Sequence, residues 1–184
     1  NCKECGSPTC MAFCMKVAQG ALPIEKCPHM GADVIAKLSE ATAPPMKTIQ
    51  VGDFKMGGET VLARHEKTFV SKNLYAVSVS DSMENADQVL ADLQKVDYER
   101  IGERMFVEMV FVTYAGNKDA YVELAKKAAA VPGRAIILDV NCPTCAKEAL
   151  EATKGAAVIL NGATAENAEE MNALATEYKA VLGV

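Results

Sequence analysis

The sequence predicts an α/β protein in which a short cysteine-rich segment precedes a longer run of alternating strands and helices. Five of the 7 cysteines fall within the first 27 residues, and from residue 74 onward strand patterns alternate with helical patterns. Between them lies SEATAPPMKT, whose small residues and Pro44-Pro45 pair favour an extended linker. We therefore expect a first domain over residues 1–38, a linker and β-hairpin over residues 39–73, and a β–α array over residues 74–184.

The first domain is defined by Cys2, Cys5, Cys10 and Cys27, which follow the spacing C-x2-C-x4-C-x16-C. Thiolates bind iron and bridge it to sulfide better than oxygen ligands do, so this spacing predicts an iron–sulfur cluster held by these four residues. Because such a cluster stores electrons, this part of the chain is expected to handle electrons. Thr9 can cap a helix that begins near Cys10.

Other uses of these cysteines are less favoured. A structural zinc site usually takes two C-x2-4-C knuckles, and this segment holds one. A disulfide framework fits poorly, because 7 is an odd number and the sequence shows no secretory signal. Cys14, one helical turn after Cys10, is expected to be a small buried residue on the packing face. A place beside the cluster, or a role as substitute ligand, is the alternative for Cys14.

The segment after the linker predicts a β-hairpin, because TIQVGDF and GGETVLA are short alternating runs around Gly52-Asp53 and Gly57-Gly58. It continues into RHEKTF, residues 64–69, which holds one of only 2 histidines. Its charged side chains could bind an anion or organise an interface, and a solvated strand end explains them equally well.

The remainder alternates four strand patterns with four helical patterns, which predicts parallel strands joined by right-handed crossovers. Four such units fit half of a (β/α)8 barrel or a small open doubly wound sheet. The sequence lacks both the G-x-G-x-x-G fingerprint of dinucleotide binding and a Walker-type phosphate loop. The strands are expected over residues 74–81, 106–116, 135–140 and 156–163, and the helices over residues 83–96, 117–131, 142–155 and 166–184.

Polar residues follow the strands at their carboxyl ends, where such folds carry function. For each of them a turn or a helix cap is favoured over catalysis, and no catalytic residue is predicted. Asp81, Asn117, Asn141 and Thr164 suit capping. The full set at the strand ends is Ser80, Asp81, Thr113, Tyr114, Asp139, Asn141, Cys142, Asn161 and Gly162.

Cys142 and Cys145 form a second C-x2-C, at a strand-to-helix turn. A redox dithiol often lies at such a turn, because the helix N-terminus lowers the pKa of a thiol. The surrounding β–α array is not a thioredoxin pattern, so capping and packing are favoured for this pair.

Composition argues against nucleic-acid and membrane partners. The net charge is −5, Trp is absent, and the basic residues are scattered among acidic ones instead of forming a stripe. No apolar run approaches the roughly 20 residues needed to cross a bilayer. Half of the residues are hydrophobic, so a real core can form, and a cytoplasmic protein is expected.

Taken together, these segments resemble the large (gamma) subunit of the corrinoid iron–sulfur protein. The cluster segment is similar to the domain that opens that subunit, and GGETVLARHEKTF and ILDVNCPTCAKEALEATKGAAVILNGAT resemble its barrel domain. The likeness covers essentially the whole chain. It implies a [4Fe-4S] cluster on Cys2, Cys5, Cys10 and Cys27, followed by the first half of a TIM barrel.

The resemblance implies a methyl carrier of the reductive acetyl-CoA pathway. In that family a cobalt corrinoid takes a methyl group from a methyl-tetrahydropterin and delivers it to acetyl-CoA synthase, and the cluster reduces Co(II) to Co(I). The implied partners are the small subunit, the methyl-tetrahydropterin methyltransferase, acetyl-CoA synthase/CO dehydrogenase and an electron donor such as ferredoxin. Whether the chain is itself an enzyme is left open, because the partners supply much of the catalysis.

The family's corrinoid (cobamide)-binding domain follows the barrel and has no matching segment here. The chain is therefore expected to be a fragment that holds the electron-delivery half. Two other classes stay open at this point: a stand-alone ferredoxin-like electron carrier with an α/β docking domain, and a scaffold whose cysteines hold zinc.

Overall fold

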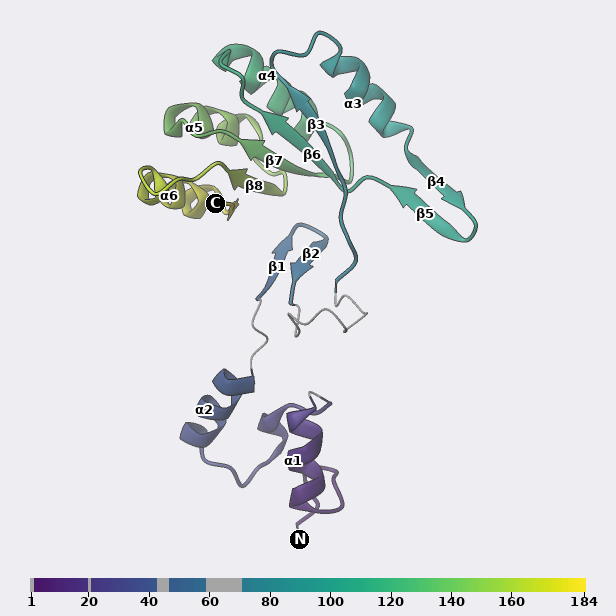
Figure 1. Ribbon diagram of the computed structural model, residues 1–184, viewed down its shortest axis with the longest axis vertical. Helices are drawn as coiled ribbons and strands as arrows, with labels where there is room; N and C mark the ends of the chain where they lie inside the picture. The colour runs from purple at the N-terminus through teal and green to yellow at the C-terminus, as the bar shows by residue number, and fades with distance from the viewer. Residues whose placement is uncertain (1, 20, 43–46, 59–70) are drawn as a thin grey trace. The chain divides into compact units, whose positions relative to one another are not determined.

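The computed structural model describes residues 2–19, 21–42, 47–58 and 71–184 of the chain (Figure 1). It divides into two compact units. The first, here called the cysteine unit, comprises Asn1–Lys47 and Gly58–Thr68, and the second, the sheet unit, comprises Thr48–Gly57 and Phe69–Val184. Among the described residues, no helix combines the length and the apolar character that crossing a bilayer requires.

The cysteine unit contains two α-helices and one short 3-10 helix: α1 (Cys10–Ala18), η1 (Ile24–Lys26) and α2 (Ala32–Thr42). The predicted cap at Thr9 is confirmed, because its Oγ1 accepts a hydrogen bond from the Ala12 N–H at 3.1 Å. Helix α2 ends at Thr42, so the first residues of the expected linker are helical. The Pro44-Pro45 pair lies outside the described residues.

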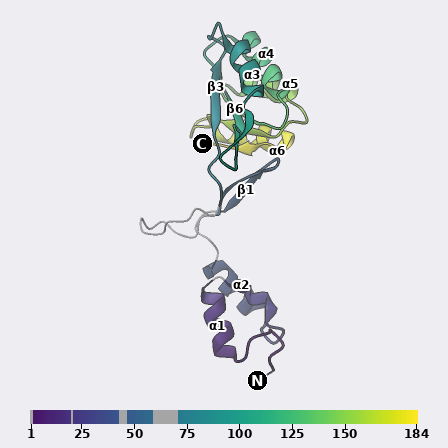
Figure 2. The ribbon, with the colours of Figure 1, turned by 90° about the vertical axis from the view of Figure 1, so that its right-hand side faces the viewer.

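The sheet unit is built on a parallel sheet of five strands in the order β3-β6-β7-β8-β9 (Figure 1). Neighbours in this sheet follow one another along the chain, and such crossovers are nearly always right-handed, so the connecting helices lie on one face. Figure 2 shows these helices together on one side of β3 and β6. The strands are β3 (Ala76–Ser80), β6 (Met109–Thr113), β7 (Ala135–Asp139), β8 (Val158–Asn161) and β9 (Val181–Leu182), and the helices are α3 (Ala86–Gln94), α4 (Lys118–Ala129), α5 (Pro143–Ala152) and α6 (Ala168–Tyr178).

The main core lies between the sheet and its helices. Side chains alternate across a strand, so every second residue faces the helices. Leu90, Leu124 and Met171 supply the helix side of this core, and all three are buried. The strand side includes a buried row in register across four strands, formed by Val79, Val112, Leu138 and Leu160.

The opposite face of the sheet is covered at its amino-terminal end by a hairpin of β1 (Thr48–Val51) and β2 (Phe54–Gly57). Val51 forms a small second core with Met109, Ala135 and Ile159. The next row toward the carboxyl ends of the strands is less covered, because Phe111 and Ile137 are only half-buried there.

Three details of the predicted array are wrong. The last helix ends at Tyr178 instead of continuing to Val184, because Lys179 adopts a left-handed conformation with φ of 55°. The apolar pair after it forms β9, which pairs with β8. Helix α3 begins at Ala86, and Met83 lies before it and is exposed.

The sequence pattern also missed a hairpin between α3 and β6, formed by β4 (Asp97–Arg100) and β5 (Glu103–Phe106). Its turn is Ile101-Gly102, with positive φ at both residues, as in the turns that suit tight hairpins. All four residues of β4 are exposed, so no apolar alternation marks that strand. Arg104 holds the two strands together through two hydrogen bonds to Asp97, at 2.6 and 2.7 Å.

A hairpin is present in the predicted region, but its turn falls inside the predicted first strand and its second strand is different. The chain reverses at Gly52-Asp53, and β1 pairs directly with β2. The second strand is therefore FKMG, whereas GGETVLA was predicted. Residues 59–63 of that run lie outside the described residues, as does all of RHEKTF.

Candidate iron–sulfur centre

The loop from Cys2 to Cys10 is shaped by two residues with positive φ. Lys3 has φ of 60° and Gly6 has φ of 75°, and the Gly6 N–H donates to the Lys3 carbonyl oxygen at 2.9 Å. This reversal surrounds Cys5, which is half-buried, and leaves Cys2 exposed. A tight turn of this kind can present two sulfurs to a single centre.

Cys10 is the first residue of α1, and its thiol is exposed. The partial positive charge of a helix N-terminus favours the thiolate form, which is the form that binds iron. Cys27 is half-buried and directly follows η1, where its N–H donates to the Ile24 carbonyl oxygen at 3.2 Å. Phe13 of α1 and Ile24 of η1 are both buried and form the apolar interior of this unit.

A surface contact between two polar side chains links the two ends of the cysteine motif. His29 Nε2 lies 3.0 Å from Glu4 Oε2, so the residue between Cys2 and Cys5 is joined to the segment that follows Cys27. Both side chains are more than half exposed, so this contact contributes little to stability. It shows that the two ends of the motif lie close together.

The cysteine sulfurs are not gathered as tightly as the ligands of one ion. Around a single tetrahedral zinc with zinc–sulfur bonds of about 2.3 Å, the sulfurs stand about 4 Å apart. In the described part of the chain, the ligating atoms that meet within 4.8 Å belong to Cys2, Glu4 and His29, and not to three cysteines. All 7 cysteines are free, so the structure shows no disulfide framework.

Ser7 supplies the observation that best tests the fit of a cluster. Its side chain is 2% exposed, and its Oγ is buried without a hydrogen-bond partner, in the loop between Cys5 and Cys10. A buried hydroxyl without a partner costs about 1–3 kcal/mol. The sulfurs of a cluster accept hydrogen bonds. The residues present therefore fit an iron–sulfur group, and sequence reasoning did not single out Ser7.

Comparison with known proteins places the chain in a family. Residues 49–184 match the family model described as "CO dehydrogenase/acetyl-CoA synthase delta subunit". The chain belongs to this family. Residues 1–29, which include all four predicted ligands, match a second family model, described as "Putative Fe-S cluster".

The chain also matches proteins with curated names over all or nearly all of its length. The chain is 31% identical to the corrinoid/iron-sulfur protein large subunit of Moorella thermoacetica, covering 100% of the chain and 43% of that protein. It is 33% identical to the acetyl-CoA decarbonylase/synthase complex subunit gamma 1 of Methanosarcina thermophila, covering 97% of the chain and 41% of that subunit. These matches confirm the resemblance to large subunits, and the chain spans less than half the length of these relatives.

The prediction that Cys14 is buried is wrong. Cys14 is exposed and not buried. Helix α1 buries Phe13 as its one buried residue, because the unit is too small to cover a second face of the helix. Cys14 lies one turn after Cys10, so it offers a free thiol on the same side of α1 as a predicted ligand.

At the carboxyl ends of the strands, two predicted caps lie one to three residues from the observed ones. Asn117 caps α4 as predicted, accepting from the Ala120 N–H at 3.2 Å. Asn141 and Thr164 were predicted to form turns or caps. The caps of α5 and α6 are Cys142 and Asn167, and Thr164 forms a turn in which its carbonyl oxygen accepts from the Asn167 N–H at 3.2 Å.

Asp81 does not cap the helix that follows it. Its carboxylate accepts from the backbone N–H groups of Ala115 at 2.7 Å and Asn117 at 2.8 Å, which ties the end of β3 to the loop after β6. Asn161 donates to Asp139 at 2.7 Å across the neighbouring strand ends. These bonds give Asp81, Asp139 and Asn161 structural roles at this edge.

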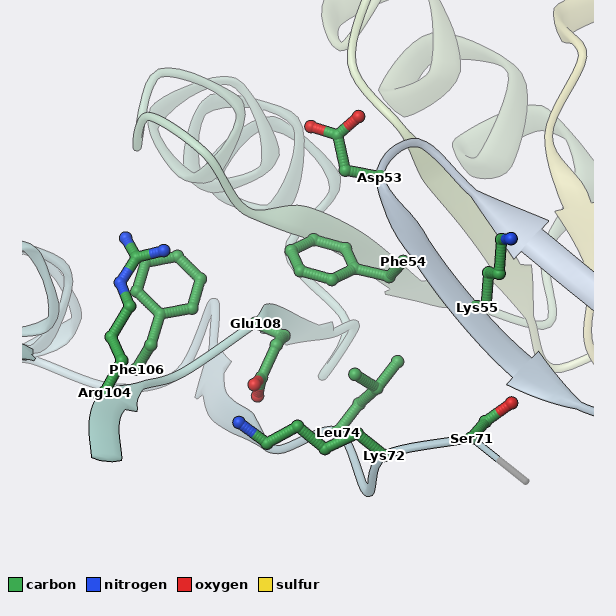
Figure 3. Close-up of a pocket in the computed structure, with 9 residues that line it drawn as sticks. All are labelled: Asp53, Phe54, Lys55, Ser71, Lys72, Leu74, Arg104, Phe106 and Glu108. Atoms are coloured by element: carbon green, nitrogen blue, oxygen red, sulfur yellow. The ribbon is translucent and has the colours of Figure 1, made fainter. Parts of the chain in front are cut away.

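A cavity of about 440 Å³ lies in the sheet unit between β2, the segment before β3 and the β5–β6 segment (Figure 3). Its wall includes Glu108, which is 5% exposed and accepts from the Tyr75 N–H at 2.9 Å. The Arg104 guanidinium lies over the Phe106 ring, 4.3 Å from its centre, and Figure 3 shows Lys72 extending toward Glu108. The sequence did not indicate this cavity, because its lining comes from three separate segments.

Proposed function

We propose that this chain is the electron-delivering part of a corrinoid iron–sulfur protein, which carries a methyl group from methyl-tetrahydropterin to acetyl-CoA synthase. The names of the relatives and the two family matches support this proposal. The proposal rests mainly on the loop from Cys2 to Cys10. This loop lies in the segment that matches the iron–sulfur family model, and it contains the buried Ser7 hydroxyl, which has no hydrogen-bond partner. That combination fits an iron–sulfur group.

Within this proposal Cys2, Cys5, Cys10 and Cys27 hold a [4Fe-4S] cluster. When bound, the cluster supplies the electron that returns cobalt from Co(II) to Co(I). The Ser7 hydroxyl, which has no partner among the described residues, is free to donate a hydrogen bond to a cluster sulfur, and such bonds raise the reduction potential of a cluster. The exposure of Cys2 and Cys10 leaves this side of the unit open to the partners that give and take the electron.

We further propose that residues 74–184 are the first half of a TIM barrel, preceded by the cluster domain over residues 1–38 and by the linker and hairpin over residues 39–73. A doubly wound sheet reverses its strand order at a switch point, whereas β3, β6, β7, β8 and β9 are neighbours in chain order. Consecutive order places the helices on one face, as in a barrel. The other face, with Phe111 and Ile137 half-buried, then corresponds to the barrel interior.

The partners that follow from this proposal are the small subunit, the methyl-tetrahydropterin methyltransferase, acetyl-CoA synthase/CO dehydrogenase and a ferredoxin-type electron donor. The names of the methanogen relatives place those proteins in an acetyl-CoA decarbonylase/synthase complex. We assign no residue of this chain to the corrinoid itself. A cytoplasmic location stays a prediction.

The ligand set can be tested with a matched pair of cysteines on one helix. We expect anaerobically purified protein to contain about four irons per chain and to show a spin-half EPR signal after dithionite reduction. Cys10→Ser should lose most of the iron and the signal, whereas Cys14→Ser should keep both. A Cys10→Ser, Cys14→Ser double variant shows whether Cys14 replaces a missing ligand.

Three results would contradict the proposal. Protein that retains zinc and gives no EPR signal would exclude the electron-delivery role. Full iron content in the double variant would exclude Cys10 as a ligand. Loss of iron in Cys14→Ser alone would assign the fourth ligand to Cys14 instead.

A further inference from the structure

The pair Cys142 and Cys145 is outside the proposed electron-delivery role and has a defined geometry. Cys142 is the N-cap of α5, and its Sγ accepts from the Cys145 N–H at 3.4 Å. The Thr144 hydroxyl lies 3.0 Å from the same sulfur. Cys142 is half-buried, whereas Cys145 is 4% exposed. One thiol is therefore partly exposed and the other is covered, three residues apart at the first turn of α5.

This arrangement is typical of reactive dithiols. A sulfur at a helix N-terminus receives backbone N–H groups and the positive end of the helix dipole, both of which favour the thiolate. Pro143 occupies the first turn of α5, where its fixed φ suits the start of a helix. Capping and reactivity are compatible, because the hydrogen bond that caps the helix also stabilises the thiolate of Cys142.

The pair also borders a hollow at the carboxyl edge of the sheet. The neighbouring Cys145 thiol raises the pKa of Tyr114, the residue directly after β6. Tyr114 and the residue before Cys142 both line a cavity of about 190 Å³. The complete lining is Tyr114, Asp139, Val140, Asn141 and Gly162. Neither cysteine is among these residues, so the hollow lies beside the pair.

We propose that Cys142 and Cys145 form a thiol–disulfide exchange site whose co-substrate is a disulfide-bonded molecule. The Cys142 thiolate attacks one sulfur of that disulfide, forming a mixed disulfide and releasing one thiolate. Cys145 then loses its proton and attacks the Cys142 sulfur, which releases the second thiolate. The two protein thiols lose two electrons and two protons, and the co-substrate gains them as two thiols.

The pKa values of the two thiols agree with this order of attack. Hydrogen bonds from the Cys145 thiol, the Thr144 hydroxyl and the Cys145 N–H lower the pKa of Cys142 to about 7. Burial, together with the bond that it donates to Cys142, raises the pKa of Cys145. Cys142 is therefore the attacking thiolate near neutral pH, and Cys145 is the resolving thiol.

Other titratable groups face the pair from the elements packed against it, and they bear on its pH dependence. Lys118 of α4 lies within electrostatic reach of Cys145, but it is paired with Glu148 at 2.6 Å. Tyr121 of α4 is buried against the same region, and burial raises its pKa, so it stays neutral. The remaining groups near Tyr114 and Tyr121 are Asp81 and Asp139.

The first test follows the two sulfurs in the intact protein. Full-length chain with its cluster is equilibrated anaerobically in glutathione buffers of increasing oxidised fraction, alkylated and digested with trypsin. Cleavage after Arg134 and Lys147 gives a peptide, residues 135–147, that contains both thiols and no other cysteine. We expect a reversible change from two alkylated thiols to one intramolecular disulfide. Thiols that stay alkylated in the most oxidised buffer would overturn the proposal.

The second test compares the folded site with its own sequence unfolded. Because the pKa of Cys142 is lowered to about 7, its alkylation rate should fall as the pH drops through about 7. In a synthetic peptide of residues 139–149 the corresponding midpoint should lie near the ordinary cysteine value of about 8.5. At pH 7 we expect Cys142 in the protein to react about threefold faster, after allowing for its weaker intrinsic nucleophilicity. Equal midpoints would overturn the proposal.

Two variants separate the attacking from the resolving role. Cys145→Ser should accumulate a stable mixed disulfide with glutathione on Cys142, whereas Cys142→Ser should leave Cys145 unmodified because it is covered. Modification of Cys145 in the absence of Cys142 would contradict the assigned order. Both variants are read out on the peptide of residues 135–147, which contains none of the proposed cluster ligands. Loss of the cluster can therefore be told apart from loss of thiol–disulfide exchange at Cys142 and Cys145.

The source of the disulfide is distinguished by a parallel arm. Glutathione disulfide and an oxidised protein of the thioredoxin type are compared at equal concentration, with residues 135–147 as the readout. Faster oxidation by the protein would identify a protein disulfide as the co-substrate, and faster oxidation by glutathione disulfide would identify a small molecule. Oxidation by neither would overturn the proposal.

Discussion

At the scale of single residues, Ser7 gives the sharpest test of the iron–sulfur centre. Its hydroxyl is buried without a partner, so Ser7→Ala removes a donor that no described protein atom uses. Hydrogen bonds to cluster sulfurs stabilise the more negative, reduced state. Losing about 1 kcal/mol of such stabilisation lowers a one-electron potential by about 40 mV. An EPR-monitored redox titration measures this shift.

The control for Ser7→Ala is Ser82→Ala, which changes an exposed serine in the sheet unit. It should leave the potential unchanged. If Ser7→Ala also leaves the potential unchanged while the iron content is normal, the hydroxyl does not donate to the cluster.

The cysteine spacing predicted the candidate ligands but not their surroundings. Spacing is a local property, so C-x2-C-x4-C-x16-C can be read directly from the sequence. Burial depends on what packs against a residue. Cys14 was expected to be buried and is exposed, and Ser7 drew no attention and is buried. The residues next to Cys14 and Ser7 in the sequence do not indicate which of the two is buried.

At the scale of elements, the turn of the β1–β2 hairpin depends on a glycine. Gly52 has φ of 57°, and a Cβ there would lie 2.8 Å from the Ala157 Cβ, just before β8. Gly102, in the β4–β5 turn, has φ of 75° with nothing within 4 Å. Both Gly→Ala changes should cost about 1 kcal/mol through backbone strain. Gly52→Ala should cost a further 1–2 kcal/mol, approximately, because it overpacks the contact with Ala157.

Urea unfolding followed by far-ultraviolet circular dichroism measures both losses, since the chain has no Trp to report by fluorescence. Equal losses for the two variants would contradict the close packing of the hairpin on β8.

The elements that were predicted correctly are those whose burial repeats along the sequence. Strand β7, for example, is apolar throughout apart from its last residue, and α4 shows a clear buried stripe. The hairpin of β4 and β5 has no such pattern, because β4 is exposed at every position. Strand β9 has two residues, too few to show a period, and its existence depends on pairing with β8.

At the scale of the whole molecule, the two units differ in how much apolar surface they bury. In the part of the chain that the structure describes, the buried apolar residues of the cysteine unit are Phe13 and Ile24. The sheet unit has a continuous core between its strands and helices. Small domains with so little core usually need a metal or another cross-link to fold. The cysteine unit should therefore owe its order to a bound cluster, and the sheet unit should not.

Removal of iron tests this difference. After the cluster is oxidised and extracted with a chelator, we expect amides of α1 to lose most of their protection from hydrogen exchange. Amides of β6, β7 and β8 should keep theirs, because no predicted ligand lies in the sheet unit. Gly52→Ala is the matched control, since it should weaken protection in the sheet while leaving α1 unchanged. Simultaneous loss of protection in α1 and the sheet would mean that the two units fold as one cooperative structure, and the proposed independence of the cluster domain would be wrong.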